Sequence, residues 1–207
     1  NRRMSLFTIL TCCLVAPCAY LISGLNPAIV LSHLLYHEDI RDRGSGNPGF
    51  TNFNRVYGKT SWIVFFLDVG KGLATCWAGA LAFAKSGLPF QLGASYAGFF
   101  AMLGHCYPVW YQFKGGKGFL VAVAAIFLMD VRIALIAGAV LCAVLFTTRY
   151  MSLSTILAAA SCPPLFLLFG YQSVWVPVIC TASVLLLVFR HKANIGRLLK
   201  GTEKKFS

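Results

Sequence analysis

The chain has 207 residues, of which 58% are hydrophobic and only 12% are charged, and its mean hydropathy is +0.73. Soluble domains contain about 45–50% apolar residues, so the composition excludes an ordinary soluble domain and predicts a polytopic membrane protein. Its length suits one compact bundle, which we expect to form a single domain over residues 1–207. The net charge is +12, without a nucleic-acid-binding motif. In a membrane protein such charge indicates topology signals and anionic ligands or lipids.

We predict an all-α bundle of about seven transmembrane helices, at residues 6–36, 62–84, 92–113, 119–129, 133–147, 153–169 and 174–189. The Gly-Leu-Asn-Pro stretch at 24–27 predicts a kink in the first helix, and a polar loop over 38–60 follows it. The fourth helix is short or partly re-entrant, because its 11 residues span about 16 Å against a hydrocarbon core of about 30 Å. It follows directly on a Gly-Gly-Lys-Gly turn.

The basic residues are distributed unevenly about this topology. Thirteen fall on one side, and four (Arg2, Arg3, Lys85 and Arg132) fall on the other. The positive-inside rule therefore predicts an outside N-terminus and a cytoplasmic C-terminus. It also brings three basic, glycine-, asparagine- or histidine-bearing segments to the cytoplasmic face, where they could form one site.

The first basic segment, residues 44–55, has three glycines in six residues, then hydroxyl, amide and arginine side chains, and no acid. Glycine lets backbone N–H groups approach a ligand closely, and the polar side chains add donors. The pattern predicts a cradle for phosphate or another small oxyanion. The alternative is a flexible loop between spans. The candidate residues are Ser45, Gly46, Asn47, Gly49, Thr51, Asn52 and Arg55.

The second basic segment, residues 104–118, ends in Lys-Gly-Gly-Lys-Gly immediately before the short helix. A helix N-terminus presents free N–H groups and partial positive charge, and Lys117 adds a full charge. With Gly115, Gly116 and Gly118, the turn resembles a phosphate-binding loop in its flexible backbone and positive charge, although the GxxxxGK[ST] pattern is absent. The alternative is a topology signal that needs glycine only to turn. His105 is more typical of a satisfied interior histidine than of a base.

The third basic segment, residues 190–199, begins with Arg190 and His191. His191 and Asn194 are three residues apart and share a helical face. Neighbouring cations lower the pKa of His191 and keep its ring neutral near pH 7. The alternative is an amphipathic interfacial helix, and both interpretations can hold.

Asp68 and Lys71 lie inside a span, where charges are costly. They form either an internal ion pair or a ligand contact through Lys71.

Together these segments resemble the acyl-phosphate-dependent glycerol-3-phosphate acyltransferases, the PlsY family of bacterial inner-membrane enzymes. GSGNPGFTNFNR at 44–55, GHCYPVWYQFKGGKG at 104–118 and RHKANIGRLLKGTE at 190–203 are similar to its three cytoplasmic motifs, and DVGKG at 68–72 fits its second span. The resemblance extends over almost the whole chain, in order. A departure is Phe50, which stands where a small residue is usual.

The resemblance implies transfer of a fatty acyl group from acyl phosphate to the 1-hydroxyl of sn-glycerol 3-phosphate, giving lysophosphatidic acid and inorganic phosphate in phospholipid synthesis. Because the acyl phosphate carbonyl is already activated, we expect direct transfer without an acyl-enzyme. The implied partners are both substrates and membrane lipid, and the soluble enzyme that produces acyl phosphate is a further candidate. We expect no metal, no cofactor and no nucleic acid, and a multi-pass protein of the inner membrane whose site faces the cytoplasm.

The resemblance also implies roles. It implies that phosphate is contacted by Ser45, Thr51, Arg55, Lys117 and Asn194, and that His191 contacts the attacking hydroxyl or its phosphate. The predicted catalytic residues are His191, Ser45, Arg55, Lys117 and Asn194, whereas Thr51 is a phosphate-binding residue. The glycines at 115, 116 and 118 shape the acyl-phosphate site. Further phosphate-binding candidates are Gly46, Asn47, Gly49, Asn52 and Lys71, with Asp68, His105, Arg190 and Glu203 in supporting positions. Either His191 or the substrate's own phosphate takes the proton.

The main alternative function is a membrane transporter of a phosphorylated organic anion, since basic cradles at broken spans suit transport as well. Such transporters are generally longer and built from repeats, and the sequence has no internal repeat. A match to the H-x-x-x-x-D pattern of acyl-CoA-dependent acyltransferases, at residues 37–42, has only two fixed positions and is discounted.

Overall fold

The computed structural model describes residues 6–171 and 173–206, and every regular element in these ranges is a helix. The predicted all-α class is therefore confirmed for the described residues, whereas Arg2 and Arg3 lie outside them. The α-helices are α1 (Leu6–Gly24), α2 (Pro27–Tyr36), α3 (Phe50–Tyr57), α4 (Ser61–Lys85), α5 (Phe90–Cys106), α6 (Phe119–Met129), α7 (Val131–Thr148), α8 (Met151–Leu168), α9 (Trp175–Arg190) and α10 (Lys192–Leu199). Short 3₁₀ turns occupy Ile40–Asp42, Gly58–Thr60 and Val109–Tyr111.

The predicted kink is a complete break between α1 and α2. Asn26 is buried there, and its Oδ1 accepts the N–H groups of Ala28 at 3.0 Å and Ile29 at 3.2 Å. It thereby caps α2, which begins with Pro27, a residue suited to a first helical position. The Asn26 amide also donates to the Pro48 carbonyl at 3.1 Å. The break therefore anchors the first basic segment.

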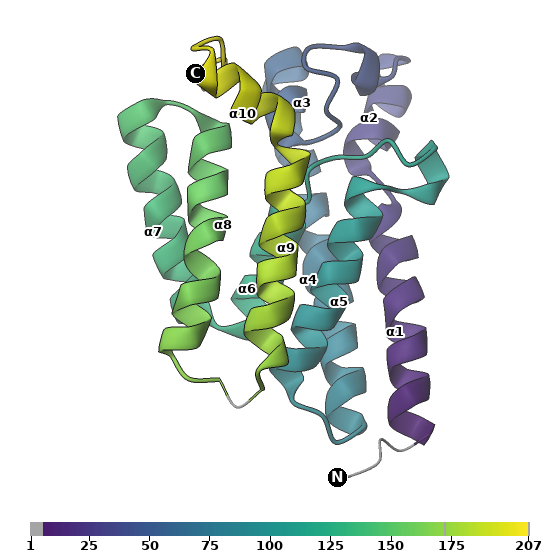
Figure 1. Cartoon of the computed structure of the whole chain (residues 1–207). Helices are drawn as coiled ribbons and strands as arrows, with labels where there is room; N and C mark the ends of the chain where they lie inside the picture. The colour runs from purple at the N-terminus through teal and green to yellow at the C-terminus, as the bar shows by residue number, and fades with distance from the viewer. Residues whose placement is uncertain (1–5, 172, 207) are drawn as a thin grey trace.

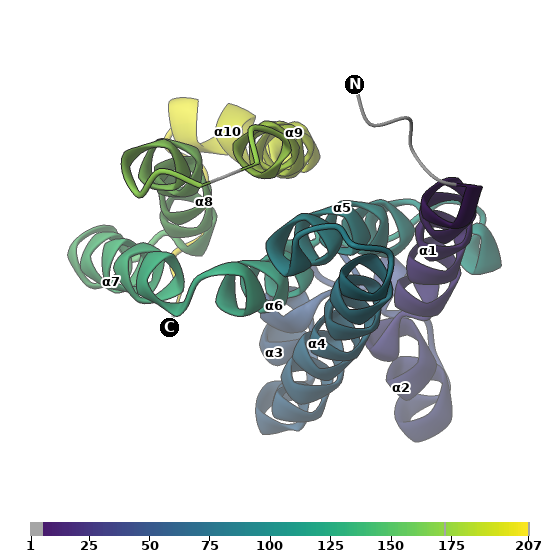
Figure 2. The same ribbon diagram turned by 90° about the horizontal axis from the view of Figure 1, so that it is seen from below.

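The long helices stand side by side, and the chain reverses direction from each to the next (Figures 1 and 2). Small residues let α4, α5 and α6 pack closely, as in other membrane bundles. A Cβ added at Gly98 of α5 would lie 2.7 Å from the Cβ of Ala125 in α6. One added at Gly79 of α4 would collide with Ala97 of α5.

The described helices include four stretches that are long and apolar enough to cross a membrane, or five if the α9–α10 pair counts as one bent span. The protein is thus an all-helical integral membrane protein with four or five candidate spans. With 11 residues, α6 falls short of this length, as its sequence predicted. The count of seven crossings stays a prediction.

Two predicted boundaries were wrong. The stretch 38–60, interpreted as a loop, contains α3, because Phe50, Phe53 and Tyr57 place apolar rings on one side of an otherwise polar helix. Phe53 is fully buried in a small core with Val64 of α4. The third span ends at Cys106 instead of Phe113, because Pro108 follows and the chain turns back into the bundle.

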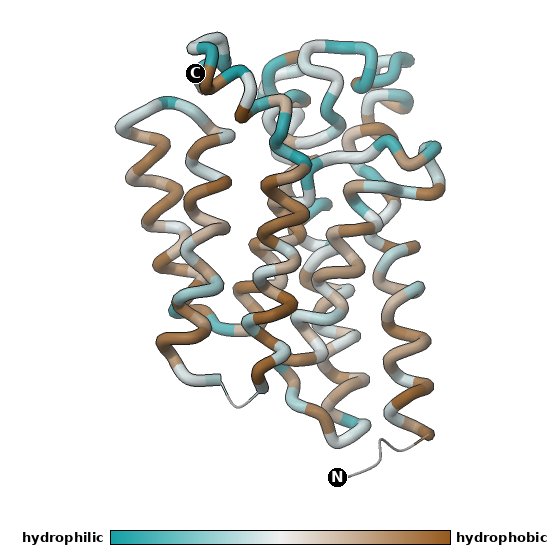
Figure 3. Tube along the Cα trace, in the orientation of Figure 1, coloured by the Kyte–Doolittle hydropathy of each residue, from teal (hydrophilic) through white to brown (hydrophobic). Residues whose placement is uncertain are grey.

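Polar residues gather at the end of the bundle that carries α3 and α10, while α1 begins at the opposite end (Figure 3). The connection between α5 and α6 lies at the same polar end (Figure 1). The predicted gathering of the three basic segments at one face is therefore observed.

Candidate active site

A cleft of 420 Å³ opens at the polar end of the bundle. Its lining includes Arg55 from the first basic segment, Lys117 from the second and His191 from the third. These residues come from α3, from the turn before α6 and from the bend between α9 and α10 (Figure 1). The prediction that the three segments come together is confirmed, because all three line this one cleft.

The first basic segment contributes the N-terminus of α3. Gly49 is its N-cap residue, in extended conformation, and no side chain caps the helix. First-turn N–H groups lack helical partners and carry partial positive charge, so an anion is the natural cap. Phe50 turns its ring onto Trp62 of α4, with 5.3 Å between ring centroids. The cleft is lined here by Ser45, Asn47, Gly49, Thr51, Asn52 and Arg55.

Asn52 holds the shape of this segment. It is 2% exposed, its Oδ1 accepts the N–H of Ser45 at 2.8 Å, and its Nδ2 donates to the Arg43 carbonyl at 2.9 Å. Its polar groups are thus engaged by the loop, and we revise its predicted role from ligand to loop support. Gly46, with φ of +72°, also supports the turn and lies outside the lining.

The second basic segment returns into the bundle before α6 begins. The N–H groups of Gly115 and Gly116 donate to the carbonyls of Cys106 (3.2 Å) and His105 (3.0 Å). Arg190 donates to the carbonyls of both glycines, at 2.8 and 3.0 Å. These groups are therefore not available to a phosphate, and neither glycine nor Arg190 lines the cleft. A Cβ at Gly116 would collide with His105 Nε2.

The N-terminus of α6 is the part of this segment that faces the cleft. Gly118 is the N-cap residue, with φ of +78° and no side-chain cap. Lys117, Gly118, Phe119 and Leu120 line the cleft. A second uncapped helix N-terminus, with a lysine beside it, thus meets the same space as α3.

A polar network joins Lys117 to the third basic segment. Lys117 Nζ donates to Asn194 Oδ1 at 2.5 Å, and Asn194 Nδ2 donates to Glu203 Oε1 at 2.5 Å. Ser152 (2.7 Å) and Arg197 (2.6 Å) also donate to Glu203. Burial lowers the pKa of Lys117 to about 8, although the Glu203 carboxylate opposes the shift.

His191 lies at the bend between α9 and α10 and is 3% exposed. Its Nδ1 is 2.8 Å from the Leu187 carbonyl, so Nδ1 carries the hydrogen of the neutral ring and Nε2 is left as an acceptor. Nε2 lies 3.3 Å from Oγ1 of Thr155, which donates to the Ser152 carbonyl at 2.9 Å. Burial, with a smaller contribution from Lys117, lowers the pKa of His191 to about 4.

Asp68 and Lys71 form an ion pair inside the bundle. Lys71 Nζ lies 2.8 Å from Asp68 Oδ1 and 3.1 Å from His105 Nδ1, and it donates to the Leu25 carbonyl at 2.9 Å. Asp68 and His105 line the deep side of the cleft, whereas Lys71 does not. Of the two interpretations of the sequence, the structure favours the internal pair, and Lys71 is better described as a support than as a phosphate ligand.

Comparison with known proteins agrees with this geometry. Residues 13–201 match the family model for glycerol-3-phosphate acyltransferase. Glycerol-3-phosphate acyltransferases of Methylococcus capsulatus and Staphylococcus saprophyticus are 38% and 36% identical, covering 93% and 90% of this chain and 94% of each relative. The chain belongs to the glycerol-3-phosphate acyltransferase family.

Two solved structures of PlsY, an integral membrane glycerol 3-phosphate acyltransferase, are similar to this acyltransferase. Its glycerol 3-phosphate form has a TM-score of 0.86 at 33% identity, covering 95% of this chain and 96% of that one. Its lysophosphatidic acid form has a TM-score of 0.83 at 32% identity, covering 95% of each chain. The resemblance inferred from the three segments is confirmed, and the protein is an enzyme. Family membership thus favours catalysis over the transport alternative.

The acyltransferase cleft also has residues that the sequence interpretation missed. Ser152 and Thr155 enter it from the start of α8, and Arg197 and Thr202 enter it from α10 and the C-terminal tail. The available signal was a cluster of hydroxyls at residues 152–155, which begins three residues after the basic Arg149, at the start of an apolar span.

Proposed function

We propose that this glycerol-3-phosphate acyltransferase takes its acyl group from an acyl phosphate and passes it directly to the 1-hydroxyl of glycerol 3-phosphate. The products are lysophosphatidic acid and inorganic phosphate. The cleft suits two phosphorylated substrates, because two uncapped helix N-termini and the cations Arg55, Lys117 and Arg197 surround it.

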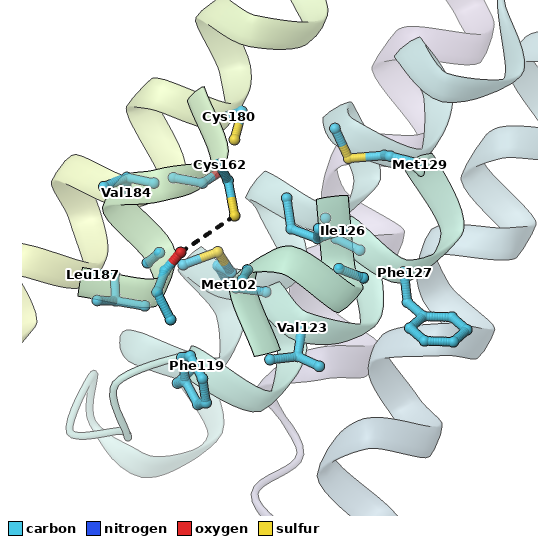
Figure 4. A pocket seen from close by; sticks show the side chains of 18 of the residues that line it. Met102, Phe119, Val123, Ile126, Phe127, Met129, Cys162, Cys180, Val184 and Leu187 are labelled. Atoms are coloured by element: carbon cyan, nitrogen blue, oxygen red, sulfur yellow. Dashed lines mark hydrogen bonds between the residues drawn. The ribbon is translucent and has the colours of Figure 1, made fainter. Parts of the chain in front are cut away.

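One observation carries the proposal. The basic cleft adjoins an apolar cavity of 330 Å³ (Figure 4), and both are lined by Phe65, Phe119, Leu120 and Leu141. A phosphate at the N-terminus of α6 would thus have apolar space directly beside it. That combination fits a donor with a phosphate at one end and a hydrocarbon chain at the other.

The reaction needs no nucleophile from the protein. Thr155, the hydroxyl nearest to His191, already donates its hydrogen to a backbone carbonyl and is not activated by the ring. The glycerol 1-hydroxyl attacks the acyl carbon, a new ester C–O bond forms, and the bond to the phosphate oxygen breaks. Lys117 and the N-terminus of α6 stabilise the negative charge that develops on the carbonyl and leaving oxygens.

The proton of the glycerol hydroxyl goes to the leaving phosphate. With a pKa of about 4, His191 is a weak base at neutral pH, whereas the second pKa of a phosphate group is about 6. His191 Nε2 accepts a hydrogen bond from the hydroxyl and orients it. Of the two proton acceptors, the low pKa of His191 therefore favours the substrate's phosphate.

A donor comparison tests this function. Purified protein is incubated with glycerol 3-phosphate and either palmitoyl phosphate or palmitoyl-CoA, and lysophosphatidic acid and free phosphate are measured. We expect product from palmitoyl phosphate only, and at least about a hundredfold loss for Lys117→Ala, which removes transition-state charge stabilisation. Product from palmitoyl-CoA alone would overturn the proposal.

A further inference from the structure

The apolar cavity runs beside α6, away from the polar cleft. Phe119 lies at one end of it, and Met129, Cys162 and Cys180 lie at the other (Figure 4). The three far-end residues are at most 5% exposed and belong to a packed core cluster with Ile133. The cavity therefore adjoins the site at Phe119, and packed side chains bound its other end.

Three small residues on α7, Ala134, Ala137 and Gly138, leave this space unfilled. They line the cavity together with Leu141, and the spacing of the four residues places them on one helical face. Small residues in membrane helices usually serve close packing, but Gly138 does not. A Cβ added there would meet nothing within 4 Å, unlike one at Gly98, which would press on Ala125.

We propose that the donor's acyl chain occupies this cavity with its methyl end against Met129, Cys162 and Cys180, and that the cavity's depth sets the chain-length preference. The inference rests on the proposed function. From Phe119 to Met129, α6 rises about 15 Å. With C–C bonds of about 1.5 Å and angles near 111°, each carbon advances about 1.25 Å. About twelve carbons beyond the carbonyl therefore reach the packed end, and longer chains must bend or leave between helices.

Shape must provide this selectivity. An acyl chain that enters from the bilayer exchanges one apolar environment for another, so it gains little from the hydrophobic effect. A chain that exceeds the available space strains its surroundings, at a cost of about 1–3 kcal/mol in packed cores. Chain length is therefore discriminated by the position of the cavity wall.

Leucine substitutions at two depths test the inference. Helices α6 and α7 meet at Asp130 and run in opposite directions (Figure 1). Ala134 therefore lies about 10 Å below the level of Phe119 and Gly138 about 4 Å below it. Ala134→Leu should lower kcat/KM for palmitoyl phosphate about tenfold or more and leave octanoyl phosphate within about twofold. Gly138→Leu should lower both. Ala139→Leu, exposed and outside the lining, is the control and should change neither.

The results separate the inference from the proposed function. If the wild-type protein uses neither acyl phosphate, the proposed function fails. If it uses both and Ala134→Leu lowers them equally, or leaves palmitoyl phosphate unaffected, the inference is wrong and the cavity holds ordinary membrane lipid. Should Ala134→Leu not fold, Met129→Ala provides the opposite test, since a deeper cavity should favour stearoyl over palmitoyl phosphate relative to wild type.

Discussion

The burial of Lys117 favours its neutral form, whereas its proposed function requires the charged form. The site needs a cation beside the α6 N-terminus, yet burial lowers the pKa of Lys117 to about 8. The amine is charged below this pH and neutral above it, so we expect kcat/KM to fall as pH rises through about 8. A Lys117→Arg variant stays charged and should lack this alkaline limb, even if its rate is lower. A pH–rate profile of both proteins checks this, and an identical limb in the arginine variant would assign it to another group.

His191 provides a second test at this scale. Glutamine can place an oxygen near the position of Nε2, where it accepts a hydrogen bond but takes no proton near neutral pH. If His191 orients the hydroxyl, His191→Gln should keep activity within about tenfold of wild type, while His191→Ala should lose about a hundredfold. A general base contributes about 10²–10⁴-fold. Equal losses in that range for both variants would restore His191 as the base.

The residue types predicted the chemistry of the site, but they did not show which residues face the cleft and which support the loops around it. Arg55, Lys117, His191 and Asn194 line the cleft as the pattern indicated. Asn52 and Gly116 are residue types equally suited to binding phosphate, but their polar groups form hydrogen bonds with the backbone instead. The sequence cannot distinguish a residue that faces the cleft from one that supports a loop, because the backbone groups that bind the supporting residue come close to it only in the folded protein.

At the scale of elements, the turn before α6 depends on close contact. Gly116 has no room for a Cβ because His105 lies against it. Gly116→Ala should therefore displace Lys117 and the first turn of α6, and a shift of about 1 Å can lower the rate about a hundredfold. Gly196→Ala in α10 is the matched control, since a Cβ there meets nothing within 4 Å. Steady-state rates of the two purified variants decide, and full activity of Gly116→Ala would contradict the geometry.

Long apolar helices were predictable from sequence, and short polar ones were not. The α1–α2 break and the short α6 follow from Pro27 and from the apolar length, which are local features. The missed helix α3 holds its place through Phe53 packing on α4, a contact between elements. Ser152 and Thr155 were missed for the same reason, because only packing of α8 beside α9 carries them to His191.

At the scale of the whole molecule, the distribution of charge predicts orientation. The cleft lies at the basic end, which the positive-inside rule assigns to the cytoplasm. After replacement of the exposed native cysteines, single cysteines at Lys59 and Arg132, both exposed, can be labelled with an impermeant maleimide. We expect Arg132→Cys to react in cells with a permeable outer membrane and Lys59→Cys only in inverted vesicles. The reverse pattern would place the site on the outer face.

The central claim is that one cleft holds both phosphorylated substrates during transfer. It is tested most directly by measuring free phosphate and protein-bound acyl group when purified protein receives palmitoyl phosphate without glycerol 3-phosphate. We predict no release and no acylated protein until glycerol 3-phosphate is added, and then one phosphate for each lysophosphatidic acid. A burst of one phosphate per protein molecule, with the acyl group retained on the chain, would contradict direct transfer.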